Sequence, residues 1–411
     1  MSAVGRRRAA LFVLFFLPGV ALASWVTRTP AIRDLLSASP AEMGLVLFGL
    51  SVGSMCGILS SGALVARFGA RPVIFAGTVC TVAAMPGIGV GAALESNWLV
   101  AAGLFVFGLG MGGGEVAMNV EGADVERVLS RPVLPALHGC FSLGNLAGAL
   151  AGIAFTATDV PVVWHLIGVG ALAAVGLVVV IGSLPAGTGR AVPVPRAERG
   201  SAAGRPLWKD RTLLLIGAIV LAMALAEGSA NDWLPLVMVD GHGLDPAYGS
   251  AVYAAFAAAM TVGRFAGGVV IERLGRARVI AMSAVAASIG LVLIIFVDQP
   301  VVAAAGVLLW GLGASLGFPV ALSAAGDSGP NPAGRVSLVA TVGYVAFLVG
   351  PPALGFIGEH YGLRLALLVP LVLVALVIPI APALGRTPAA DAAGPDADSA
   401  PVKGGAERRV Q

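Results

Sequence analysis

Two carboxylate–amide pairs inside apolar stretches are the strongest candidates for chemistry in this sequence. Glu115 stands four residues before Asn119, and Glu227 stands four residues before Asn231, so each pair lies on one face of a helix. An ionisable side chain inside a membrane-spanning helix costs about 2.5 to 3.5 kcal/mol on insertion scales, so its presence needs a reason. We predict that Glu115 binds a proton and that both pairs face a cavity. The alternative for Glu115 is a structural hydrogen bond to a neighbouring helix.

Three other polar features have simpler interpretations. Asp232 lies beyond Glu227 along the same run and precedes Trp233, so we expect it at the outer interface, as a gate or headgroup contact. His138 begins an apolar run near the inner interface, where helix packing is favoured over a role as a proton relay. The run that holds Glu115 ends in a charged cluster that we expect to be solvated and internally paired: Glu121, Asp124, Glu126 and Arg127.

The composition places these residues in a membrane protein. Of the 411 residues, 58% are apolar and 11% are charged, whereas a soluble domain has roughly 45 to 50% and about 25%. The basic residues lie in short islands between apolar runs, which gives no support to nucleic-acid binding. Cys56, Cys80 and Cys140 lie in apolar runs without CxxC or His spacing, so the sequence indicates no disulfide, metal site or cofactor.

Twelve apolar runs are long enough to cross a bilayer, which takes about 20 residues. They cover residues 9–27, 41–66, 71–93, 97–123, 134–157, 161–183, 212–238, 246–271, 279–297, 300–325, 336–357 and 363–384. The first run resembles a secretory signal that would be cleaved after Ala23. An uncleaved helix is favoured, because it gives an even number of membrane spans. We therefore expect an all-α membrane protein with twelve transmembrane helices.

The basic residues determine the predicted orientation. Of the 25 Lys and Arg, only Arg28, Arg33 and Arg364 fall in segments on the predicted outer side, and Arg264 falls inside the eighth run. The positive-inside rule then places both termini in the cytoplasm and the chain in the inner or plasma membrane.

The chain divides into two halves that resemble each other. Arg67-Phe68-Gly69 recurs as Arg273-Leu274-Gly275 at an offset of 206, and Gly108-Leu109-Gly110 recurs as Gly311-Leu312-Gly313 at an offset of 203. An even number of spans separates the copies, which indicates a parallel repeat. The predicted parts are a six-helix bundle at 1–184, a Pro-rich cytoplasmic linker at 185–211, a second six-helix bundle at 212–385 and a disordered tail at 386–411.

The second copy of the repeated loop contains a longer motif. The stretch from Gly268 to Arg278 resembles the signature loop of the major facilitator superfamily, Gly-x-x-x-acid-Arg-x-Gly-basic-x-basic, with Glu272 as the acid. The first copy keeps its glycines and two arginines but has Ala66 at the acidic position. The resemblance implies two parallel six-helix bundles and an inner gate, which closes when the loop acid pairs with loop arginines and caps a helix of the opposite half.

We therefore expect an inner gate made of both loops and of acids at the ends of the fourth and tenth spans. Its predicted members are Arg67, Gly69, Arg71, Gly268, Glu272, Arg273, Gly275, Arg276, Arg278, Asp124 and Asp327. Because only Glu272 supplies the loop acid, we expect an asymmetric gate. A carboxylate that caps a helix N-terminus is stabilised by about 0.3 to 1 kcal/mol through the helix dipole. The alternative is that the loop arginines only set the topology.

The Glu-x-x-x-Asn pattern after a Gly-rich fourth span is similar to that of the fucose-permease-like branch of sugar and proton symporters. This resemblance implies that Glu115 takes part in proton coupling and substrate binding, with Asn119 beside it. The counterparts in the second half, at an offset of 203, are the apolar Phe318 and Leu322. The fold therefore does not require polar residues at these positions. That branch also has an acid in its first span, and this sequence has none in residues 11–27.

These features predict a secondary transporter that moves a small polar solute by alternating access, with proton-coupled symport favoured. The alternative is a proton-coupled efflux antiporter for drugs or metabolites, whose Gly-Pro signature in the fifth span is missing between Leu143 and Gly152. A sensor or channel is disfavoured because no long extramembrane domain or pore loop is present, and an enzyme because no nucleophile and base converge. The expected partners are the solute, protons and the lipid bilayer, without nucleic acid, and we expect a monomer.

Overall fold

The computed structural model describes residues 3–130, 133–190, 207–329 and 332–385. Twelve helices in these ranges are long and apolar enough to cross a membrane, so the predicted number of spans is confirmed. The predicted disordered tail and the greater part of the predicted linker lie outside the described residues.

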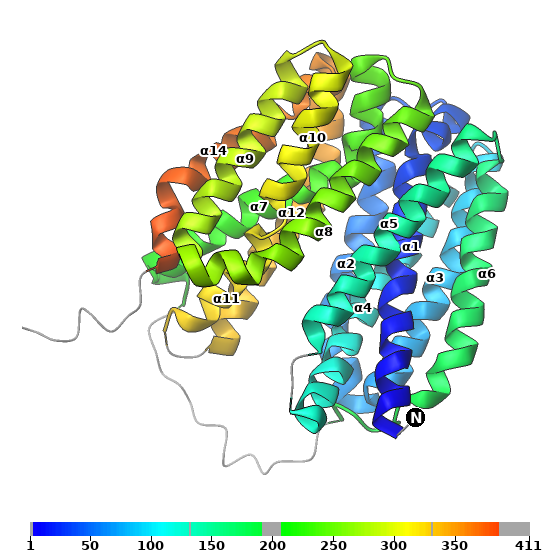
Figure 1. Ribbon diagram of the computed structural model, residues 1–411. Coiled ribbons are helices and arrows are strands. Elements are labelled where there is room, and N and C mark those ends of the chain that lie inside the picture. Colours follow the sequence, from blue (N-terminus) through cyan, green and yellow to red (C-terminus); the bar gives the residue numbers. More distant parts are fainter. Residues whose placement is uncertain (1–2, 131–132, 191–206, 330–331, 386–411) are drawn as a thin grey trace, which may run out of the picture.

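The two halves contain six spans each (Figure 1). The first half comprises α1 (Ala3–Leu36), α2 (Pro40–Phe68), α3 (Ala70–Ala93), α4 (Asn97–Leu129), α5 (Leu134–Ala157), α6 (Val162–Val180) and the short η1 (Ile181–Ser183). The second half comprises η3 (Leu207–Lys209), α7 (Arg211–Leu236), η4 (Val237–Gly241), α8 (Pro246–Leu274), α9 (Arg276–Phe296), α10 (Pro300–Ala314), α11 (Gly317–Asp327), α12 (Pro332–Tyr361), α13 (Leu363–Ala366), α14 (Leu368–Ile380) and η5 (Ala381–Gly385).

Several helices extend beyond the apolar runs that predicted them. The first run covers residues 9–27, whereas α1 begins at Ala3 and ends at Leu36. Hydropathy marks only the part of a helix that crosses the hydrocarbon core, and the backbone hydrogen bonds continue into the interfacial regions on both sides. The run therefore located the helix correctly but placed both of its ends too far inward.

The repeated loops form the same tight turn in both halves. A single residue separates α2 from α3, and a single residue separates α8 from α9. Each is a glycine with a positive φ, +89° at Gly69 and +78° at Gly275. A side chain at either position would be strained, because glycine adopts positive φ at far lower cost than other residues.

The tenth span is broken, although residues 300–325 were predicted as one uninterrupted run. α10 ends at Ala314, and α11 begins at Gly317 after a short turn. A Cβ on Gly317 would lie 2.5 Å from the Cβ of Met223, so the missing side chain lets α11 approach α7. The turn itself packs on α8, where Leu316 lies over Gly267.

A stripe of glycines on α5 makes a close helix contact, as the four-residue spacing predicts. A Cβ on Gly144 or on Gly148 would collide with the backbone of α1, at Phe16 and Val20 respectively. A Cβ on Gly152 would collide with the side chain of Thr27 on the same helix. The stripe therefore serves packing between α1 and α5, and it does not face the solute cavity.

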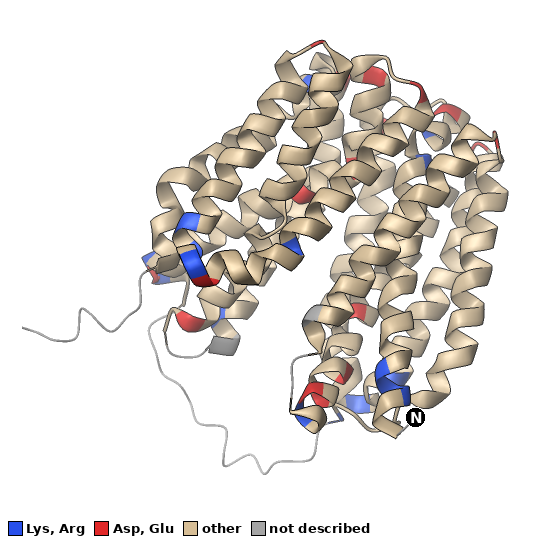
Figure 2. Cartoon of the chain, viewed as in Figure 1, with Lys and Arg blue, Asp and Glu red and all other residues tan. Residues whose placement is uncertain are grey.

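The halves meet at the predicted outer side and separate toward the predicted inner side, where the N-terminus lies (Figure 1). At the outer side Gly44 of α2 lies against Gly355 of α12. Ser51 Oγ donates a hydrogen bond of 2.7 Å to the carbonyl of Phe347, and Ser250 Oγ donates one of 2.9 Å to the carbonyl of Thr27. Charged residues gather mainly at the two ends of the helices (Figure 2). The two halves are therefore closed against each other at the predicted outer side and open toward the predicted inner side.

Candidate solute and proton site

A cavity of about 1120 Å³ lies between the two halves. Helices of both halves line it, and most of its wall is apolar, as in binding sites for small molecules. The first half contributes the polar residues Ser51, Ser54, Glu115, Asn119, His138, Ser142 and Asn145. The second half contributes Glu227, Asn231, Asp232, Thr261, Arg264, Arg276, Ser323 and Tyr344. All four residues that the two Glu-x-x-x-Asn patterns predicted for a cavity thus lie in its wall.

Glu115 and Asn119 face the cavity from one side of α4. Glu115 is exposed to it and has no hydrogen bond or ion pair with any residue that the structure describes. Oδ1 of Asn119 lies 3.0 Å from Nε2 of His138. His138 also packs edge-on against the ring of Phe15, with 5.2 Å between ring centroids. His138 therefore belongs to the polar wall of the cavity as well as to the packing of α5 against α1.

The counterparts of this pair in the second half occupy the same cavity. Phe318 and Leu322 line it from α11, and the ring of Phe318 lies 6.3 Å from that of Tyr344. The repeat therefore presents equivalent helix faces to the cavity from both halves. At these two positions only the first half carries polar side chains.

Glu227 is held by an arginine that the sequence analysis left unassigned. Arg264 of α8 donates a hydrogen bond of 2.8 Å from Nη2 to Oε1 of Glu227 on α7. The Glu-x-x-x-Asn pattern does not reveal this partner, because the arginine belongs to the neighbouring span. A signal was present in the sequence: Arg264 falls inside the apolar run of the eighth span, nearer its inner end.

Asp232 was expected at the outer interface as a gate or a headgroup contact, and the headgroup contact was wrong. Asp232 lines the cavity, and its neighbour Trp233 is buried. The seventh span continues beyond Asp232 to Leu236 and then through η4, so Asp232 lies well inside the bundle. Asp232 has no hydrogen bond or ion pair within the described ranges.

Asn231 belongs to a small polar network at the same level. Its Oδ1 accepts a hydrogen bond of 3.1 Å from the hydroxyl of Tyr253. Asn145 of α5 lies beside the same hydroxyl, so polar groups of the two halves meet at this level. Oδ1 of Asn145 is buried and has no partner among the described residues.

The predicted gate residues lie at the inner ends of the helices, and most of them do not bridge the halves in this state. Arg276 donates hydrogen bonds of 2.6 Å to Asp327 and 3.1 Å to Ser323, both in the second half. Arg67 lies over the ring of Phe68. The remaining loop side chains Glu272, Arg273 and Arg278 are exposed, Arg71 is half-buried, and Gly268 lines the cavity. The halves are apart at this predicted inner side, so the two loops do not contact the described residues of the opposite half in this state.

The cluster at the inner end of α4 is more buried than expected. Arg7 of α1 forms ion pairs with Glu121 and Asp124, and Asp124 also pairs with Arg127. The side chain of Glu121 is fully buried, so the expectation of a solvated cluster was wrong for this residue. The pairing of Asp124 ties α1 to α4 within the first half.

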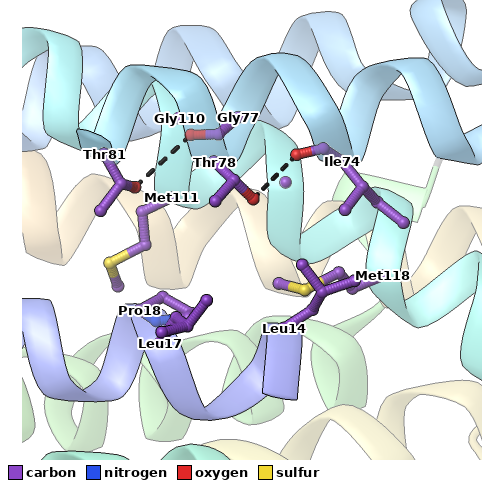
Figure 3. A pocket seen from close by; sticks show the side chains of 11 residues that line it. Leu14, Leu17, Pro18, Ile74, Gly77, Thr78, Thr81, Gly110, Met111 and Met118 are labelled. Carbon is purple, nitrogen blue, oxygen red and sulfur yellow. Dashed lines mark hydrogen bonds between the residues drawn. The ribbon is translucent and has the colours of Figure 1, made fainter. Parts of the chain in front are cut away.

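A second, much smaller pocket lies inside the first half (Figure 3). Its volume is about 20 Å³, and it is lined mostly by apolar residues of α1, α3 and α4. The hydroxyls of Thr78 and Thr81 donate to backbone carbonyls of their own helix, at Ile74 and Gly77. The pocket is therefore too small for a solute, and its polar groups are already satisfied.

The comparisons with known proteins agree with this architecture. The family model described as Major Facilitator Superfamily matches residues 9–340. An uncharacterized MFS-type transporter of Yersinia pestis is 31% identical over 359 residues, which cover 86% of this chain and 89% of that protein. A D-xylose-proton symporter superimposes with a TM-score of 0.73 at 12% identity, over 92% of this chain and 97% of its own. The Escherichia coli fucose:proton symporter superimposes with a TM-score of 0.63 at 17% identity, over 92% of this chain and 98% of its own. At these identities the two structures establish the shared fold.

Proposed function

The chain belongs to the major facilitator superfamily, and we propose that it moves a small polar solute by proton-coupled symport. Its two halves alternate in opening the central cavity to either side of the membrane. One observation carries the coupling proposal: Glu115 faces the cavity without a partner among the described residues, while Glu227 is paired with Arg264.

Glu115 is the proposed proton carrier because its charge decides whether the cavity can close. Arg264 acts on Glu115 electrostatically, but its hydrogen bond goes to Glu227. An ionised Glu115 would therefore be enclosed with its charge incompletely balanced, which is costly in a medium of low dielectric constant. A proton on Glu115 removes that cost and leaves Glu227 and Arg264 as a neutral pair. The carrier loaded with solute and proton then closes, and a carrier that has bound solute without the proton resists closing.

The remaining polar groups supply solute contacts. Asn119, Asn231 and Ser142 line the cavity with groups that donate and accept hydrogen bonds, as hydroxyl groups of a solute require. The resemblance in fold to the fucose:proton and D-xylose-proton symporters supports this proposal. We further propose that both termini lie in the cytoplasm of a cell whose inner or plasma membrane holds the protein, because the basic residues gather at that end.

Uptake into proteoliposomes with an imposed pH gradient tests the function. The purified protein is reconstituted and offered a panel of labelled polar solutes, with the lumen either alkaline or acidic relative to the medium. Symport predicts accumulation only with an alkaline lumen, and a protonophore should abolish it. Accumulation only with an acidic lumen would instead identify an antiporter, and accumulation independent of the gradient would reject proton coupling.

A further inference from the structure

The charges of the cavity do not balance, and the imbalance has a definite location. Three carboxylates line the cavity, those of Glu115, Glu227 and Asp232. Arg264 is hydrogen-bonded to Glu227, and the other lining arginine, Arg276, is hydrogen-bonded to Asp327 at the inner end. Among the described residues, two cavity carboxylates therefore remain unpaired. A proton on Glu115 neutralises one of them, and Asp232 remains.

Asp232 lies deeper than Glu115 and away from the cavity cations. α7 runs from the inner to the outer side, and Asp232 lies five positions beyond Glu227, which is roughly 7.5 Å along the helix. At its level α8 presents Tyr253 and Phe256, whereas Arg264 lies further along α8 toward the inner side. Asp232 therefore faces the closed, outer end of the cavity.

The groups around Asp232 are suited to a donor with positive charge. Oδ1 of Asn145 is a buried acceptor with no partner within the described ranges, and Asn145 lines the same cavity. An ammonium group offers three hydrogen-bond donors and a positive charge. This end of the cavity supplies what such a group requires: a carboxylate and a carbonyl acceptor, neither of them with a partner in the part of the chain that the structure describes.

We propose that the transported solute bears one protonated amine and that Asp232 binds it. The inference rests on the proposed function and specifies its substrate class: a small polar solute with hydroxyl groups and a single ammonium group. The proton on Glu115 and the ammonium on Asp232 together neutralise the cavity, so neither alone permits full closure. A neutral sugar would leave Asp232 enclosed as a bare anion, which is costly.

Binding to the purified, full-length protein tests this proposal without any gradient. Melting temperatures are measured with matched sets of neutral, amine and carboxylate compounds: glucose, glucosamine and glucuronate; glycerol, 3-amino-1,2-propanediol and glycerate. We expect the amine of at least one set to stabilise the protein and its neutral and acidic partners to do so far less. Equal or greater stabilisation by a neutral or acidic compound, or no stabilisation by any amine, would overturn the proposal.

Two variants assign the effect to Asp232. Asp232→Asn should weaken binding of the stabilising amine by about 30-fold and leave binding of its neutral partner unchanged. Asp245→Asn removes the same charge from an exposed position outside the cavity and should bind the amine like the wild type. The melting temperature without solute shows whether each variant is folded. Undiminished amine binding by folded Asp232→Asn would refute the role of this residue.

The outcome separates this inference from the proposed function. Amine binding without uptake under either pH gradient would leave the amine site standing and would reject symport. Proton-driven uptake of a neutral solute by both the wild type and Asp232→Asn would support symport and reject the amine site.

Discussion

Arg264 Nη2 lies 2.8 Å from Oε1 of Glu227, and this hydrogen bond distinguishes the two glutamates that the sequence presents in the same pattern. Both precede an asparagine by four residues, and both line the cavity. Glu227 is held by a guanidinium from the neighbouring helix, whereas Glu115 has no ion pair in the part of the chain that the structure describes. Similar local sequence thus produces two different electrostatic environments.

Glu115→Gln should uncouple transport from the proton gradient. The amide imitates the protonated carboxyl, so the carrier can close in every cycle without taking up a proton. We expect accumulation driven by a pH gradient to be lost and exchange of labelled for unlabelled solute to persist. Glu126→Gln, on the same helix but outside the cavity, should retain both activities. Accumulation by Glu115→Gln under the gradient would move the coupling role to another carboxylate.

Arg264→Ala should destabilise the protein by about 1 to 3 kcal/mol, because it leaves Glu227 in the cavity wall without its charged donor. The double variant with Glu227→Ala should lose less stability than the two single variants added together, since the second change removes the unpaired carboxylate. Thermal unfolding of the four proteins in the same detergent gives the coupling between the two residues. Strict additivity would contradict the pairing.

The inner end of α7 should be sensitive to acid through Asp210. Its side chain caps α7 by accepting from the N–H of Leu213 at 3.1 Å, and it is paired with Arg335. Burial raises the pKa of Asp210, but the hydrogen bonds from Arg335 and Leu213 outweigh this effect and lower the pKa below its ordinary value. A lowered pKa in the folded state stabilises the protein at pH values above the pKa of the unfolded chain, about 3.9. This stability is lost as the pH falls through the pKa of the folded state.

Asp210→Asn keeps the helix cap and removes the charge, so it isolates this effect. We expect the wild type to be more stable than the variant at neutral pH by ~1 kcal/mol. The difference should shrink as the pH falls below about 4. Melting temperatures measured across this range check the prediction, and a difference that is constant with pH would contradict it.

The inner gate should depend more on the second loop than on the first. Only the second loop has an acid, Glu272, while the first has Ala66 at the same position. Glu272→Ala should disfavour the state that is closed on the inside, and Ala66→Asp should favour it. Labelling of a cysteine at Ser54 in the cavity, in a variant without the three native cysteines, reports inner accessibility. Labelling should rise with Glu272→Ala and fall with Ala66→Asp; no change in either variant would count against the gate.

The sequence alone determined the number of spans, the family resemblance and the repeated loops that hold Gly69 and Gly275. It also predicted that Glu115, Asn119, Glu227 and Asn231 face a cavity. These features follow from apolar length, residue spacing and the backbone freedom of glycine, which act within one helix or one turn. Each of them is encoded by residues that are close together in the chain.

Only the tertiary structure decided which side chains meet across helices. The partner of Glu227 lies 37 residues away on α8, and Arg7 reaches Glu121 over 114 residues. Asp232 was expected at the membrane surface, but the helix extends beyond it and its face turns toward the other half. Rotation of a helix about its axis and the choice of its neighbours are set by packing of the whole bundle, and the electrostatics of the cavity follow from that packing.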